Sequence, residues 1–271
     1  MKQYRLHFPI RVILNAVLVC GYNVLYTNVK IGGFFMDQPE QIIANEGKAL
    51  EVNIGVKNFI RIPVKTHLIK REDNIVDVAC TYLKDKVKEG DIVFITEKIV
   101  GITQGRAIPL NEIKPRPLAV FLAKYVTKTP AGIGLGMPET MEMALKECGT
   151  LRILFAAVIG AISKILLKRK GDFYRIAGPK ARAIDGPTSG TIPPYNTHVV
   201  LGPDNPDKVA AEVSYALGGI RIVISDINDL GGNILGASHK DININEVVEI
   251  LKDNPLGQGH QQTPMGIIRQ A

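Results

Sequence analysis

Residues 222–238 read IVISDINDLGGNILGAS, and this stretch carries the main signal for the fold. An apolar run typical of a buried strand ends at Asp226, and Asp229 and two glycines follow. Such strands, alternating with helical patterns, are typical of mixed α/β proteins. Carboxylates at the carboxyl ends of strands, followed by glycine, are a usual position for ligands or metal ions in open α/β sheets. The stretch therefore predicts a strand and a candidate site together.

Composition predicts a globular protein of a reducing compartment. The chain has 271 residues, of which 46% are hydrophobic, which is enough to bury a core and excludes disorder for most of it. Cys20, Cys80 and Cys148 stand far apart, with no CxxC pair and no histidine at metal-ligand spacing. Neither a disulfide framework nor a zinc site is indicated, and we expect a cytoplasmic protein.

The charge balance is basic, with 33 Lys and Arg against 26 Asp and Glu, a formal net charge of +7. Nucleic acid could use this excess, but it is not clustered with aromatic residues, and only Lys168–Lys170 forms a run. A short basic run is more often a solvated turn. We therefore expect no nucleic-acid partner, and a small molecule that bears phosphate would use the same charge.

The first residues resemble a targeting segment, because Lys2, Arg5 and Arg11 precede the apolar run 12–20. The run is interrupted by Asn15 and is shorter than the ~20 residues of a bilayer span. A signal peptide and a poorly integrated extension both remain open as interpretations. We prefer the extension, over residues 1–48, with one domain over residues 49–271 and no membrane partner.

Strand and helix patterns alternate along the rest of the chain. Pro63 in the β-type run 59–69 is typical of an edge strand or a bulge. Asp73 is placed to cap a helix that follows, and residues 153–167 are apolar nearly all round, which predicts a buried helix. We predict the remaining strands at 92–96, 198–202 and 220–226 and in the tail, and the remaining helices at 113–125, 138–148, 207–217 and 245–252. The fold class is mixed α/β.

Two acidic positions stand out as candidate metal ligands. Asp185 lies in ARAIDGPTSG (181–190), before a Gly-Pro turn, and Asp226 ends the strand described above. Magnesium and manganese prefer oxygen ligands, usually one or two carboxylates with substrate phosphates. The alternative is that these aspartates only form turns or cap helices.

Other motifs are less specific. Lys98 and Arg106 flank a turn after the strand 92–96 and would suit a triphosphate or a carboxylate, or they are solvated strand ends. GIGLGMPET (132–140) is glycine-rich but lacks the GK[ST] ending of a phosphate loop, so close helix packing is the alternative. GQGHQQTPMG (257–266) offers amides that hydrogen-bond substrate edges, or it is a turn-rich closing segment. The histidines form no catalytic set, which disfavours nucleophilic hydrolysis.

Four segments in order resemble one family. They read GDIVFITEKIVGITQGR (90–106), ARAIDGPTSG (181–190), VVLGPDNPDKVAAEV (199–213) and VISDINDLGGNILGAS (223–238). Together they are similar to the coenzyme F420-0:L-glutamate ligase family, over about residues 58–240, and the tail resembles that of a ligase-like subgroup. The resemblance implies the F420 ligase-like fold, an α/β (mixed α+β) architecture, and an intertwined homodimer.

The resemblance also implies a reaction and its residues. Family members use GTP with Mg²⁺ or Mn²⁺ to activate the carboxylate of F420-0 as an acyl phosphate, which the amine of L-glutamate attacks. Metals and cations that spread charge supply most of the catalysis of phosphoryl transfer. By resemblance Asp185 and Asp226 are the metal ligands, and we expect Asn228 and Asp229 to complete the metal shell in place of the family's hydroxyl ligand. We expect Asp185, Asp226 and Lys98 to be the catalytic residues, although Lys98 comes earlier in its segment than the family's lysine. The nucleotide-binding residues are Ile62, Pro63, Val64 and Lys65, in a strand similar to the family's GLPLI, with Thr96, Glu97, Lys98 and Arg106.

Two departures from the family pattern leave an alternative open. The family's SDT reads SDI here, so Ile227 replaces a hydroxyl ligand, and Ile102 stands where the family tends to have a lysine. The alternative function is a non-catalytic protein that binds a nucleotide or a deazaflavin-like ligand. The acid and amine substrates stay open.

Overall fold

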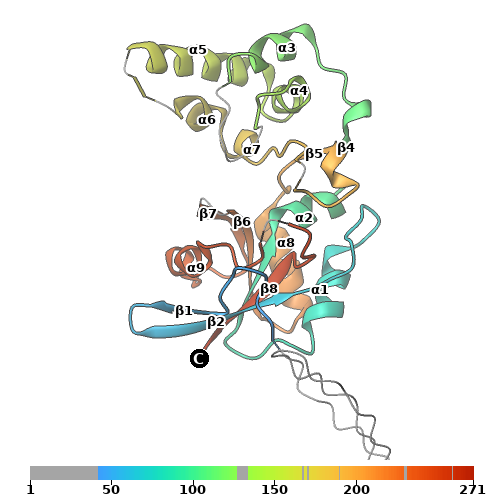
Figure 1. Cartoon of the computed structure of the whole chain (residues 1–271), viewed down its shortest axis with the longest axis vertical. Helices are drawn as coiled ribbons and strands as arrows, with labels where there is room; N and C mark the ends of the chain where they lie inside the picture. The colour runs from blue at the N-terminus through green and yellow to red at the C-terminus, as the bar shows by residue number, and fades with distance from the viewer. Residues whose placement is uncertain are drawn as a thin grey trace, which may run out of the picture. The chain divides into compact units, whose positions relative to one another are not determined.

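The computed structural model describes residues 42–126, 134–166, 168–169, 171–188, 190–228, 231–257 and 259–271 (Figure 1). The interpretations of residues 1–41 as an extension or a signal peptide fall outside these ranges. The compact unit that the structure describes starts at Ile42, ahead of the expected boundary at residue 49. Asn45 donates to Pro255 O and Thr263 Oγ1, both at 2.9 Å, and Lys48 donates to Asp253 O at 2.8 Å.

A six-stranded mixed sheet forms the centre of this unit, in agreement with the mixed α/β class. Its strand order is β1-β2-β8-β3-β6-β7, so the last strand of the chain lies in the middle. β3 and β6 are parallel, and the other neighbouring strands are antiparallel. The strands are β1 (Glu51–Ile54), β2 (Lys57–Val64), β3 (Ile92–Thr96), β6 (Arg221–Asn228), β7 (Gly231–Ala237) and β8 (Met265–Gln270).

Both faces of the sheet are covered by helices. Successive side chains of a strand point to opposite faces, and in β3 Val93 and Ile95 join one core cluster while Phe94 joins another. The first cluster lies under α1 (Ile75–Leu83), α2 (Glu97–Thr103) and α8 (Pro206–Ala216). The second lies under α9 (Ile244–Leu251). This two-sided burial explains why β3 and β6 read as continuous apolar runs.

A helical layer with its own core lies apart from the sheet (Figure 1). It contains α3 (Pro117–Ala123), α4 (Pro138–Glu147), α5 (Thr150–Leu166), α6 (Asp172–Ala177) and α7 (Pro179–Arg182). A two-stranded ribbon of β4 (Ala107–Pro109) and β5 (His198–Val200), with 3₁₀ turns at Leu110–Glu112 and Tyr195–Thr197, leads into and out of this layer. Its helices α3 and α4 begin with Pro at their first turn, so α3 starts at Pro117, four residues after the predicted start at 113.

Two local predictions change in the structure. Asn74, and not Asp73, caps α1, because its side chain accepts from Val76 N at 2.8 Å. Asp73 instead accepts from Lys70 N at 2.6 Å and so closes the preceding turn. The strand with Pro63 is internal, but β1 pairs only with residues 57–60 of β2. Pro63 therefore lies where that side of β2 has no partner in the described sheet, and its missing N–H costs no ladder bond.

The prediction that the helix at 153–167 is buried is wrong for the described chain. In α5 only Ile153, Ala156 and Ser163 are buried. The large apolar side chains on the opposite side are exposed, at positions 151, 155, 158, 162, 165 and 166. Within the described residues no single helix is long and apolar enough to cross a bilayer, although α4 and α5, bent by 117°, would pass that test as a pair.

Candidate functional site

A cavity of about 930 Å³ opens where β3 and β6 end. Because the two strands are parallel neighbours with Thr96 opposite Ser225, the residues after them emerge at the same edge of the sheet. Glu97 and Asp226 occupy those positions, and Ser225 Oγ donates to Ile95 O at 3.3 Å to hold the strand ends together. The cavity is further lined by parts of segments 66–69, 181–195 and 256–264.

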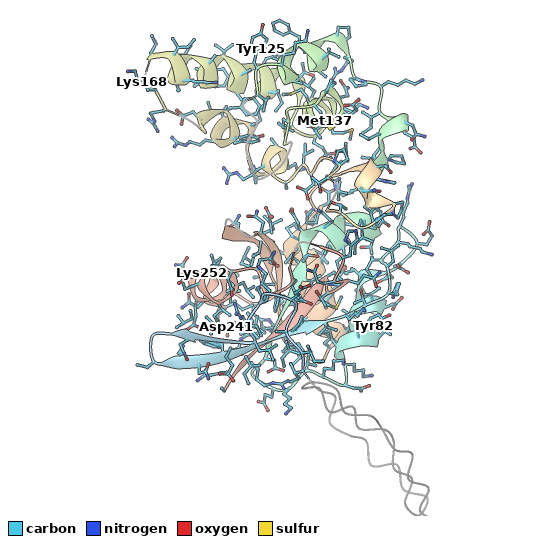
Figure 2. The ribbon with its side chains drawn as sticks, viewed as in Figure 1. Tyr82, Tyr125, Met137, Lys168, Asp241 and Lys252 are labelled. Atoms are coloured by element: carbon cyan, nitrogen blue, oxygen red, sulfur yellow. The ribbon has the colours of Figure 1, made fainter. Side chains whose placement is uncertain are left out.

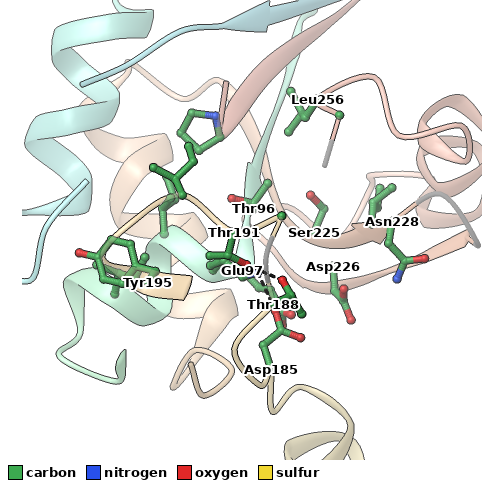
Figure 3. Close-up of a pocket in the computed structure, with 18 of the residues that line it drawn as sticks. Thr96, Glu97, Asp185, Thr188, Thr191, Tyr195, Ser225, Asp226, Asn228 and Leu256 are labelled. Carbon is green, nitrogen blue, oxygen red and sulfur yellow. Dashed lines mark hydrogen bonds and ion pairs between the residues drawn. The ribbon is translucent and has the colours of Figure 1, made fainter. Parts of the chain in front are cut away.

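The Asp185 segment reaches the same place by a different route. Asp185 forms an isolated antiparallel bridge with Val200 of β5, with Asp185 N donating to Val200 O at 2.8 Å and Val200 N donating back at 2.9 Å. This bridge directs the Asp185 carboxylate toward α2, where its Oδ2 lies 2.9 Å from Lys98 Nζ. Figure 3 shows Asp185, Asp226 and Glu97 at the same end of the cavity.

Burial and like charge dominate the electrostatics of this group. Burial raises the pKa of Glu97 well above its ordinary value, and the Asp226 and Asp185 carboxylates raise it further, against an opposing effect of Lys98. Burial also raises the pKa of Asp226, with Asp185 adding to the rise and Lys98 and Arg182 opposing it. Burial lowers the pKa of Lys98, but its acidic neighbours, Asp185 first, raise it more, so it stays a cation.

One buried oxygen in this group has no hydrogen-bond partner. The Glu97 side chain is only 8% exposed, and its Oε2 is without a partner among the described residues. A buried, unsatisfied polar atom is costly and calls for an explanation such as a ligand or a proton. The cavity therefore holds an excess of oxygen acceptors over donors at its acidic end.

The other predicted residues fall into two sets. Thr96, Glu97, Lys98, Asp185, Asp226 and Asn228 all line the cavity. Ile62, Pro63, Val64 and Lys65 do not line it, although Thr66 to Ile69 directly after them do. Asp229 lies outside the described residues.

Arg106 is placed elsewhere. Its guanidinium donates to Gly202 O at 2.7 Å and Glu147 Oε2 at 2.7 Å, and it reaches Asp204 Oδ2 at 3.2 Å. It does not line the cavity, and it joins the end of α2 to the end of α4 and to the turn before α8. An arginine held by two carboxylates fits a structural contact between elements.

The comparison with known proteins gives the family. The model of the F420-0:gamma-glutamyl ligase family matches residues 63–229, more than half of the chain. The chain belongs to this family. It is accordingly related to the F420-linked ligases, and the matched residues include Thr96, Glu97, Lys98, Asp185 and Asp226.

One relative of the chain is an uncharacterized protein of Methanocaldococcus jannaschii, which is 35% identical over 77 residues. The aligned part is 27% of this chain and 26% of that protein, so the chain matches about a quarter of that relative's length. Because that relative is uncharacterized, its similarity says nothing further about the activity of this chain.

Several residues of this F420 ligase family member line the cavity without having been singled out by sequence reasoning. Tyr195 is one, and its hydroxyl donates to Ile69 O at 2.8 Å across the cavity wall. Arg182, Thr188 and Thr191 also line the cavity, with the two threonine hydroxyls 2.8 Å apart. Gln261 and Gln262 come from the amide-rich segment, where composition was the only available signal.

The acidic end of the ligase-family cavity fits a hard divalent cation only in part. In the described ranges no three His, Cys, Asp or Glu side chains sit close enough to hold a metal ion by themselves. Magnesium, however, is usually bound through one or two carboxylates with substrate phosphates and water. Asp185 and Asp226 supply such a pair, and the partnerless Glu97 Oε2 is a further oxygen at the same end.

Proposed function

We propose that this protein is a GTP- and divalent-metal-dependent ligase that joins an amino acid, L-glutamate by family resemblance, to the carboxylate of F420-0 or a related acid. The proposal rests on one observation above all. The family match coincides with a cavity whose acidic end gathers Glu97, Lys98, Asp185 and Asp226 from two parallel strand ends and a bridge to β5.

The proposed reaction transfers the γ-phosphoryl group of GTP. An oxygen of the acid's carboxylate attacks the γ-phosphorus and GDP leaves, which gives an acyl phosphate. The nitrogen of the amino acid then attacks the carbonyl carbon, phosphate leaves with the carbon–oxygen electron pair, and the amine gives up a proton. Such a sequence needs positioned charge more than covalent participation by the protein.

The residues of the chain would divide this work by their charge. Lys98 is held at 2.9 Å from Asp185 and faces the cavity as a cation, so it would neutralise phosphate oxygens. Arg182 lines the same cavity and would share this role. Asp185 and Asp226, with Asn228 beside them, would hold Mg²⁺ or Mn²⁺, and a bound cation would neutralise the phosphates and lower the like-charge repulsion at Glu97.

We propose further that the protein works as a homodimer, with the exposed apolar stripe of α5 in the contact. Positions 151, 155, 158, 162, 165 and 166 recur at helical spacing and are 45–83% exposed. Phe121 and Tyr125 at α3 add two exposed aromatic rings whose centroids are 5.1 Å apart. Figure 2 shows Tyr125 and Lys168 along the outer edge of the helical layer. An exposed apolar helix face of this kind is typical of an interaction site.

Thermal unfolding with GTP, ATP and GDP, each with and without Mn²⁺, tests the proposal. A ligand that binds only the native state raises the midpoint, by about 2.7 kcal/mol of stability at a hundredfold excess over Kd. We expect a metal-dependent rise with GTP that Asp226→Asn removes. Asp241→Asn is the matched control, because Asp241 is exposed, pairs with Arg221 and lies outside the cavity lining.

The substrates are tested by GDP release in the presence of a candidate acid and L-glutamate. Release that needs both supports the ligase. Nucleotide binding without metal dependence and without turnover would favour the non-catalytic ligand-binding alternative, to which Ile227 in the cavity lining points. The absence of any nucleotide-induced rise would refute the GTP-dependent mechanism.

A further inference from the structure

The cavity has two chemically different walls. The charged side chains that line it, apart from His67, come from Glu97, Lys98, Arg182, Asp185 and Asp226. The wall formed by segment 256–264 is uncharged in its described lining residues, which are Leu256, Gly257, Gly259, Gln261, Gln262, Thr263 and Pro264. Figure 3 shows Leu256 and Asp185 at opposite ends of the labelled residues. A ligand that fills both walls would carry a charged part and a neutral polar part.

The uncharged wall, segment 256–264, lies outside the family match, which ends at residue 229. The segment is nevertheless held firmly, because Thr66 N donates to Gln262 O at 2.9 Å and Thr96 N donates to Pro264 O at 3.0 Å. These bonds attach it to the ends of β2 and β3, beside the acidic group. The wall is therefore preorganised.

Gln262 is the unusual residue of this wall. Its φ is +56°, in the left-handed region that a residue with a Cβ enters only at a cost in free energy. Non-glycine residues held there often lie at functional sites. The neighbouring Gln261 builds the loop, since its Oε1 accepts from Gly259 N at 2.8 Å. The carboxamide of Gln262 has no hydrogen bond among the described residues.

We propose that Gln262 is a specificity-determining residue that hydrogen-bonds a neutral cyclic amide edge of the ligand, an inference that rests on the proposed ligase function. A carboxamide presents one acceptor oxygen and two N–H donors without charge. It matches the adjacent C=O and N–H of a cyclic amide and gains little from a phosphate or a carboxylate, for which Lys98 and Arg182 are available. Such an edge occurs in the base of GTP and in the ring of a flavin-type acid substrate.

The backbone at Gln262 makes the test selective. Gln262→Gly removes the carboxamide and at the same time relieves the left-handed conformation, so the variant should fold with a thermal midpoint equal to or above that of the full-length wild type. Lys168→Gly is the matched control, because Lys168 has φ +52° and lies outside the cavity lining. It repeats the change in backbone without touching the wall.

Affinities are measured by titration calorimetry in Mn²⁺ with two pairs of probes. GTP and ATP form the nucleotide pair, since adenine lacks a cyclic amide. Riboflavin and N3-methylriboflavin form the ring pair, since methylation blocks the ring N–H. The wild type should prefer the amide-bearing member of one pair by about tenfold, the worth of one strong hydrogen bond, and Gln262→Gly should abolish that preference while Lys168→Gly keeps it.

The pair that responds identifies the source of the edge, a base or a substrate ring. A preference that persists in Gln262→Gly, or a wild type that prefers neither amide-bearing probe, would overturn the assignment of Gln262. Weaker binding of all probes at an unchanged ratio, with a lower thermal midpoint, would make Gln262 a structural residue and would also overturn it. A wild type that binds no nucleotide at all would refute the proposed GTP-dependent function. That result differs from nucleotide binding without a preference for the amide-bearing probe, which would refute only the assignment of Gln262.

Discussion

Gly101 allows α2, which carries Lys98, to pack closely against the end of β5, which bridges to Asp185. A Cβ added there would lie 2.5 Å from Leu201 O and 3.6 Å from Val200 Cγ1. Leu201 follows β5, whose Val200 bridges to Asp185, and α2 carries Lys98. Gly101→Ala should therefore push α2 away from β5 and stretch the contact of Lys98 with Asp185.

Gly101→Ala changes the free energy of unfolding through two opposing effects, a gain in helix propensity and a steric cost. Ala in place of Gly in a helix interior gains about 1 kcal/mol from propensity alone. Inserting a methyl group into a packed position costs about 1–3 kcal/mol, and the cost lies at the upper end here because the contacted atom is a backbone oxygen at 2.5 Å. We expect a net loss of about 1–2 kcal/mol, or roughly 2–8 °C in the thermal midpoint for a domain of this size.

Denaturant and thermal unfolding of wild type and Gly101→Ala measure this loss, and the GTP-induced rise in midpoint measures the site. Thr103→Ala on the same helix serves as the control, because it adds no volume and removes only the local bond from Thr103 Oγ1 to Val100 O at 3.0 Å. Both the stability and the nucleotide response should fall in Gly101→Ala and stay near wild type in the control. A Gly101→Ala protein that is more stable than wild type, as propensity alone would give, would refute the close α2–β5 contact.

Three further predictions concern other parts of the chain. Burial and Asp185 raise the pKa of Asp226, so ionisation of this carboxyl lowers the stability of the folded state as pH rises above the ordinary aspartate pKa of about 3.9. In unfolding titrations Asp226→Asn should therefore be more stable than wild type at pH 7 and similar to it at pH 3. Lower stability of Asp226→Asn at pH 7 would contradict this. Phe155→Glu should dissociate the proposed dimer in sedimentation experiments, whereas Val56→Glu, at a still more exposed position in the turn between β1 and β2, should not. A Phe155→Glu variant that stays dimeric would exclude the α5 contact. Arg106→Ala should lower the free energy of unfolding by about 1–3 kcal/mol, because the hydrogen bonds to Glu147 and Gly202 are lost. The affinity of the folded variant for GTP should be unchanged. A loss of GTP binding without a loss of stability would show that Arg106 contacts the nucleotide.

Sequence patterns were sufficient for the elements whose character is local. The apolar runs of β3 and β6 predict buried strands because a strand covered on both faces has no polar side to show. Asp226 and Asp185 stand out because a carboxylate beside an apolar run and a glycine is a signal within a few residues. Pro at the first turn of α4 and the glycines after α8 act in the same local way.

Position in space decided the rest. The sequence predicts Glu97 only as a nucleotide-binding residue at a strand end. It is the meeting of β3, β6 and the Asp185 bridge that buries its carboxyl group among like charges. Arg106 has the charge for a phosphate but is held by Glu147, which is distant in sequence. The apolar α5 was predicted to be buried, yet composition cannot say which of its faces finds a partner within the chain.

The sequence by itself therefore determined the mixed α/β class and the family, and it singled out the two aspartates as candidates, because each of these rests on short segments that are recognisable without the fold. Only the tertiary structure decided that the last strand, β8, enters between β2 and β3. That insertion carries segment 256–264 to the cavity and attaches Gln262 to Thr66. Contacts between segments so far apart in the chain are set by the packing of the whole sheet, which no local pattern encodes.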